Sequence, residues 1–63
     1  MRLYEVPDET KIRVLGKIDT PAASPDINVG DELFFRNIDG MFSYCERGNE
    51  IVHLVAWAEV EIL

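Results

Sequence analysis

Cysteine and histidine are almost missing from this 63-residue chain, which holds one residue of each type. A lone cysteine excludes a disulfide within the chain, and one cysteine with one histidine is too little for a zinc site. No stretch approaches the ~20 apolar residues of a membrane-spanning helix, and no apolar signal-peptide segment follows the N-terminus. We therefore expect a protein of the reducing cytoplasm, without a metal, another cofactor or a membrane partner.

Positive charge is also scarce: six Lys and Arg residues stand against twelve Asp and Glu residues, which gives a net charge of −6. The cations concentrate in the first 18 residues, so the remainder of the chain carries a charge of −7. Such a surface repels phosphate groups, and direct binding to nucleic acid is not expected. The acidity serves either solubility alone or docking onto a basic surface of another protein.

The second half of the chain is rich in β-branched and aromatic residues and predicts strands separated by tight turns. Asp39-Gly40 stands between strand candidates at 32–38 and 41–46, and Asp-Gly between such flanks is typical of a hairpin. The turn at 48–49 leads into a candidate at 50–57, and residues 58–63 alternate apolar and acidic side chains. Most of this half should therefore form one β-meander.

The first half predicts two more strands, at 2–6 and 10–15, joined by turn-forming residues that include Pro7 and Asp8. In the second of these, Thr10, Ile12 and Val14 alternate with Lys11, Arg13 and Leu15, which predicts a half-buried strand with a basic outer edge. Residues 17–28 contain two prolines and predict a flexible loop that contributes little to the core. Five or six short strands in a single domain over residues 1–63 predict an all-β fold. Either a small barrel or a strongly curled meander would bury the apolar face and shorten the exposed edges.

Faces can be assigned on the strand candidate at 32–38 from its alternation of side chains. Leu33 and Phe35 should share one face, and Phe34 and Ile38 the other. Apolar groups on both faces predict either a central strand or one with an exposed apolar side.

The order of short motifs along the chain resembles that of an SH3 barrel: RLYEV, a long polar loop, VGDELFF, NIDGMFSYC, EIVHLVA and AEVEIL. The resemblance implies a small SH3-like barrel. The resemblance does not extend to that family's groove for proline-rich ligands. That groove is built from characteristic tyrosine and tryptophan positions, and Tyr4 is the one match to them in this chain. Val6 replaces the second tyrosine of the first motif, and Met41-Phe42 replaces the tryptophan pair. The segment IDGMFSYC with its downstream GNEIVHL is also similar to small bacteriophage proteins, which would imply an accessory protein that binds a host enzyme.

Six aromatic residues are more than the interior of so small a domain needs, and alternation along the strands must turn some of them outward. If they gather there, they form a patch of the kind that interfaces use; the alternative is ordinary core filling. We predict a partner-binding surface of four aromatic side chains with an acidic rim: Tyr4, Phe34, Phe42, Tyr44, Glu59 and Glu61.

Residues with chemical potential are few. Cys45 and His53 lie on neighbouring strand candidates, but no third orienting group or oxyanion site is evident. Asp26, Asp31 and Glu32 border the long loop without the spacing of an EF-hand, so solvated loop acids are the better interpretation. We therefore predict no catalytic, metal-binding or cofactor-binding residue. The leading hypothesis is a non-enzymatic protein-interaction module, the alternative is a self-assembling subunit such as a homodimer, and a Cys/His enzyme ranks third.

Overall fold

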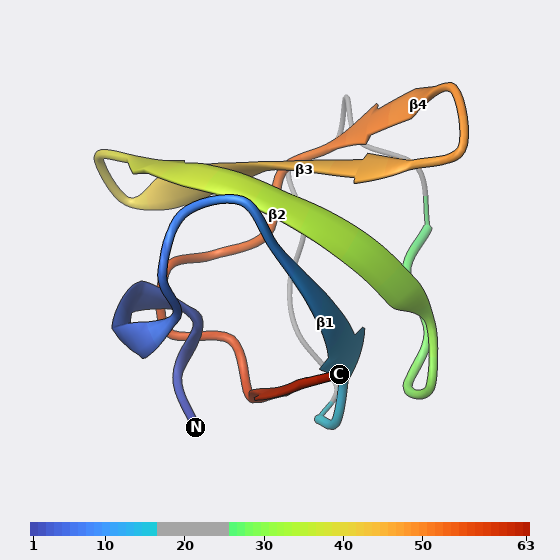
Figure 1. Ribbon diagram of the computed structural model, residues 1–63, viewed down its shortest axis with the longest axis horizontal. Coiled ribbons are helices and arrows are strands. Elements are labelled where there is room, and N and C mark those ends of the chain that lie inside the picture. Colours follow the sequence, from blue (N-terminus) through green and yellow to red (C-terminus); the bar gives the residue numbers. More distant parts are fainter. Residues whose placement is uncertain (17–25) are drawn as a thin grey trace.

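The computed structural model describes residues 1–16 and 26–63, and its five strands form one antiparallel sheet (Figure 1). A short 3₁₀ turn, η1 (Leu3–Glu5), precedes the strands. They are β1 (Thr10–Val14), β2 (Glu32–Asp39), β3 (Phe42–Arg47), β4 (Glu50–Val52) and β5 (Val60–Ile62). Their order in the sheet is β4-β3-β2-β1-β5, so the last strand returns to pair with the first.

The sheet is strongly curled but open. Closure would require β4 and β5 to pair, and no such pairing occurs among the described residues. Figure 1 shows β2 running diagonally between β1 and β3, so that β1 and β3 have clearly different orientations. The predicted all-β, five-stranded fold is thus confirmed, in its curled rather than its closed form.

The concave side of the sheet holds the core. Alternation along the strands turns Ile12 and Val14 inward on β1, and Leu33 and Phe35 inward on β2, as their spacing predicts. The remaining buried apolar residues come from η1, from β3 to β5 and from the segments beside them: Leu3, Val6, Cys45, Val52, Leu54, Val55, Ala58 and Val60. Every strand therefore contributes to one core.

Two tight turns set the register of β2, β3 and β4. Asp39 pairs with Phe42 across a loop formed by Gly40 and Met41, and Gly40 has a φ of 66°. Glycine at the first central position is what a type II′ hairpin turn requires, because other residues resist positive φ there. The predicted hairpin is confirmed, with its two-residue loop at Gly40-Met41 and Asp39 as the last residue of β2. Gly48, with a φ of 60°, occupies the same position between β3 and β4.

The predicted face of Ile38 is wrong because β2 contains a bulge. Phe35 pairs with Cys45, but the next pair is Asn37 with Tyr44, so Arg36 is an extra residue. A bulge reverses the alternation of side chains beyond it. Ile38 consequently packs against the core instead of sharing the outer face with Phe34.

The predicted strand at residues 2–6 is wrong as well. The amides of Glu5 and Val6 donate to the carbonyls of Arg2 and Leu3, at 2.9 and 3.0 Å, which forms η1. The Glu5 carboxylate accepts the Arg2 amide at 2.8 Å and stabilises this turn. The turn places Leu3 in the core, where it has no exposed surface. Of residues 2–6, only Arg2 forms a β-bridge, and its partner is Glu59.

The strand predicted at 50–57 ends at Val52. Beyond it the Ser43 hydroxyl donates to the Leu54 carbonyl at 3.0 Å and accepts from the Leu54 amide at 3.2 Å. A side chain thus satisfies the backbone groups that a strand ladder would have used. Val55 then bridges to Phe42, and the Ala58 amide closes a turn on the Val55 carbonyl at 3.1 Å.

Residues 17–25 of the predicted loop lie outside the described residues. Of the remainder, 26–28 have no regular structure, and Ile27 is partly buried against the core. This contact gives the loop's last residues a packing role that the composition of 17–28 did not predict.

Candidate functional site

Three aromatic side chains lie on the outer, convex side of β2 and β3. Phe42 and Tyr44 alternate with the buried Ser43 and Cys45, so both point away from the core. Phe34 occupies the same side of β2, since its neighbours Leu33 and Phe35 are buried. We call Phe34, Phe42 and Tyr44 the aromatic face.

The aromatic face is exposed unevenly. Tyr44 is 43% exposed and Phe42 38%, whereas Phe34 is half-buried. The Arg36 guanidinium covers Phe34, with its central carbon 5.7 Å from the ring centroid, and Arg36 also pairs with Glu46 at 3.5 Å. The bulge positions this arginine, because it is the inserted residue.

Tyr44 is held in place by its neighbour on the segment after β4. Its ring meets the His53 ring edge-on, with the centroids 4.8 Å apart. His53 Nδ1 lies 3.0 Å from the Ser43 carbonyl, which orients the imidazole. An aromatic side chain fixed before binding loses less entropy when a partner covers it.

Ile51 extends the aromatic face toward the open edge of the sheet. It pairs with Glu46 on β3, and its neighbour Val52 is buried, so Ile51 points outward and is 48% exposed. Ile51 was not predicted as a site residue, although its alternation with the buried Val52 carries the signal.

Tyr4 belongs to a different group of exposed side chains. Its amide donates to the Ala56 carbonyl, and the Ala56 amide donates to the Met41 carbonyl, both at 2.9 Å. These bonds bring η1, the β2–β3 turn and the 55–57 segment together. Tyr4, Met41 and Trp57 are all largely exposed there, and we call them the turn cluster. Met41 and Trp57 were not predicted as site residues.

The two acids predicted as a rim lie on the far side of the sheet from β3. Glu59 pairs with Arg2 at 3.2 Å, and Glu61 pairs with Arg13 at 2.8 Å. Arg13 also contacts Glu32 at 3.3 Å, and these hydrogen bonds to Glu61 and then Glu32 raise the pKa of its guanidinium. Because β1 and β2 separate β5 from β3, these acids do not border Phe42 or Tyr44.

Other acids do border the aromatic face. Asp39 is the cross-strand partner of Phe42, and Glu46 is the partner of Phe34. Glu46 is paired with Arg36, whereas Asp39 forms no ion pair within residues 1–16 and 26–63. The acidic neighbours of Phe34 and Phe42 thus come from β2 and β3 themselves.

Cys45 and His53 do not share a face. The Cys45 side chain is buried in the core, while the His53 ring contacts Tyr44 on the outer side. Burial raises the pKa of the Cys45 thiol, and a hydrogen bond with Ser43 offsets this only in part. A reactive thiol needs the opposite shift, so the arrangement does not favour nucleophilic chemistry.

Of the loop acids, Asp31 and Asp26 contact Arg47, whereas Glu32 contacts Arg13. Asp31 pairs with Arg47 at 3.0 Å and accepts a hydrogen bond from the Asn28 amide at 3.0 Å, and Arg47 also donates to the Asp26 carbonyl.

Across the described residues, no group of three His, Cys, Asp or Glu side chains could hold a metal ion. In the same residues, no helix is long and apolar enough to cross a membrane.

Comparison with known proteins gives no relative: no family model, no curated protein and no solved structure matches this chain.

Proposed function

We propose that this protein is a non-enzymatic interaction module that binds another protein through the aromatic face. The observation that carries the proposal is the outward placement of Phe34, Phe42 and Tyr44 on two paired strands. Aromatic side chains supply much of the affinity at protein interfaces, and exposed apolar clusters on small proteins mark such sites.

The size of a typical interface indicates which neighbours belong to it. A standard interface covers about 800 Å² on each partner, which is about a fifth of the 3921 Å² surface of this chain. Three aromatic residues cannot supply that area, so the footprint includes Ile51 and the acidic Asp39 and Glu46. Glu46 is already paired with Arg36, so the partner would present an apolar centre with a basic group opposite Asp39.

Self-assembly is the second candidate, because the outer edge of β4 pairs with no strand among the described residues. The outer edge of β5 is partly covered, since Met1 and Val60 exchange two hydrogen bonds of 2.9 Å. Ile51 on β4 is nearly half exposed beside the open edge, and Ile62 on β5 is exposed to a similar degree. Unpaired strand edges can pair with another chain. A homo-oligomer would cover Ile51 or Ile62, whereas a partner-binding monomer would leave Ile62 exposed.

A bacteriophage source and a cytoplasmic location remain parts of the proposal that rest on the sequence alone. The SH3-like barrel is a further part of the proposal, and the strand order supports it, since pairing β4 with β5 would complete a small barrel.

Site-specific photocrosslinking tests the proposal and does not require the partner to be identified first. A benzophenone side chain would replace Tyr44 in one variant, and Ile51, Trp57 or Val29 in the others. Val29 is a matched control, because it is 60% exposed and lies beside Gly30, whose amide binds the Val14 carbonyl far from the β2–β3 turn.

We expect a heterologous adduct in a lysate of the source cell from position 44 and a weaker one from position 51. Position 29 should give none. Adducts at twice the mass of the chain would favour self-assembly. A partner captured from position 57 but not from 44 would show that the turn cluster is the binding surface, and would contradict the proposal.

A further inference from the structure

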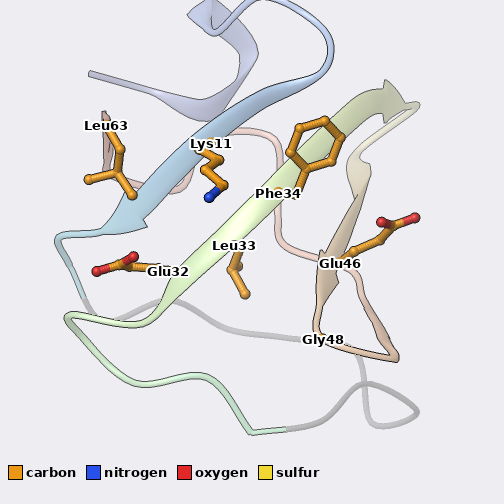
Figure 2. A pocket seen from close by; sticks show the side chains of 7 residues that line it. All are labelled: Lys11, Glu32, Leu33, Phe34, Glu46, Gly48 and Leu63. Carbon is orange, nitrogen blue, oxygen red and sulfur yellow. The ribbon is translucent and has the colours of Figure 1, made fainter.

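Outward-facing side chains on β1, β2 and β3 form a row next to the aromatic face. Lys11 pairs with Phe34, Phe34 pairs with Glu46, and the Leu63 amide donates to the Lys11 carbonyl at 3.0 Å. A cavity of about 240 Å³ lies over this row (Figure 2). Its lining comprises Lys11, Glu32, Leu33, Phe34, Glu46, Gly48 and Leu63.

The volume limits what the cavity can hold. Sites for drug-sized ligands measure ~300–1,000 Å³, and this cavity is smaller. It therefore suits a short group of a few heavy atoms rather than a nucleotide or another large cofactor.

Both carboxylates in the lining contact arginines, but Arg13 is shared between Glu32 and Glu61. Glu32 lies 3.3 Å from Arg13, and Glu46 lies 3.5 Å from Arg36. In Figure 2 the Glu32 and Glu46 carboxylates lie on opposite sides of the cavity, and both point away from Lys11. Both carboxylates therefore stand at the margins of the cavity, and neither is paired with Lys11.

Lys11 supplies the positive charge that lines this cavity. In the part of the chain that the structure describes, its ammonium group forms no ion pair. Figure 2 shows this group between the side chains of Leu63 and Phe34. A single cation flanked by apolar side chains is complementary to one negative charge on an apolar body. A dianionic phosphate fits less well, because Glu32 and Glu46 stand at the margins.

We propose that this cavity binds a carboxylate carried on a short apolar group. The carboxylate lies against the Lys11 ammonium, and the apolar part covers Phe34 and Leu63. Such a group occurs both in a free short-chain acid and at the C-terminal end of a polypeptide. The cavity shares Phe34 and Glu46 with the proposed protein-binding surface. Its test uses no partner protein and does not involve Phe42 or Tyr44, so the two proposals can fail separately.

Titrations followed by amide NMR shifts test the proposal with four probes. Hexanoate represents the free acid, N-acetyl-leucine represents a chain end, and hexanamide and N-acetyl-leucine amide are the neutral controls. We expect one or both acids to shift the amides of Lys11, Phe34, Gly48 and Leu63 in a saturable way. The neutral amides should have little effect.

Two substitutions of Lys11 complete the test. Lys11→Met should weaken acid binding about two- to fivefold, the range for one exposed ion pair, and Lys11→Arg should restore it. Saturation by hexanoate alone assigns the site to free acids, and tighter binding of N-acetyl-leucine assigns it to chain ends. Equal binding of the amides, unchanged affinity in Lys11→Met, or no saturable shift with either acid would each overturn the proposal.

Discussion

Replacing Ser43 with alanine should destabilise the fold more than the loss of one oxygen atom suggests. The Ser43 hydroxyl binds both the amide and the carbonyl of Leu54, and both residues have no exposed surface. Ser43→Ala leaves two buried backbone groups without partners. Each such group costs ~1–3 kcal/mol, so we expect a loss of about 2–6 kcal/mol in the free energy of unfolding.

That loss is large compared with the stability of so small a chain. At ~0.05–0.15 kcal/mol per residue, the whole domain is worth about 3–9 kcal/mol. The assay is a urea titration followed by Trp57 fluorescence and by circular dichroism. With a slope of about 1 kcal/mol per molar urea for a small domain, the midpoint should fall by roughly 2 M or more.

Thr10→Val is the matched control for this experiment. It also removes a hydroxyl, but the Thr10 hydroxyl donates to the Pro7 carbonyl at 2.8 Å in an exposed position. Water can replace that bond, so the expected loss is below about 1 kcal/mol. A Ser43→Ala midpoint equal to that of Thr10→Val would refute the account of how the segment after β4 is held.

Three further changes test other parts of the fold. Gly40→Val should lower the free energy of unfolding by about 1–2 kcal/mol in a denaturant titration, because a β-branched residue resists the φ of 66° at this position. No atom lies within 4 Å of the added Cβ, so the loss comes from the backbone conformation alone. An unchanged midpoint would contradict the hairpin turn. Ile27→Ala should lower stability by about 1–2 kcal/mol, whereas Val29→Ala, at an exposed position nearby, should change it by less than about 0.5 kcal/mol; equal effects would show that Ile27 is not packed on the core. Because burial raises the pKa of the Cys45 thiol above its ordinary 9.0, only the unfolded thiol ionises as the pH rises past that value. The contribution of this thiol to the free energy of unfolding should therefore be fully present below pH 9 and decrease above it. Cys45→Ala should fall less steeply over the same range, and parallel curves would argue against a buried thiol.

The core of this fold could be predicted from the sequence because alternation is a local signal. Ile12, Val14, Leu33 and Phe35 all lie where their spacing indicated. The same signal turned Phe42 and Tyr44 outward on β3. Hairpin turns were predictable for a related reason, since the need for positive φ selects glycine at a known position.

Features that depend on distant partners were not predictable in this way. No residue type in 32–39 marks the bulge at Arg36, yet the bulge decides the face of Ile38. The η1 turn depends on amides that bind the 56–58 segment, far along the chain. The ion pairs of the acidic residues likewise depend on the register of the sheet. Glu61 pairs with Arg13 because β5 returns to pair with β1.

Protein binding by the aromatic face is the central claim, and the dissociation rate of the captured partner tests it most directly. Phe42→Ala and Tyr44→Ala should each raise this rate about tenfold or more at every salt concentration, because buried aromatic anchors supply affinity. Asp39→Asn should act mainly on the association rate and its dependence on salt. Both aromatic side chains are substantially exposed in the free protein, so the variants should fold normally. Unchanged dissociation in Phe42→Ala and Tyr44→Ala, with faster dissociation in Trp57→Ala, would contradict the claim and assign binding to the turn cluster.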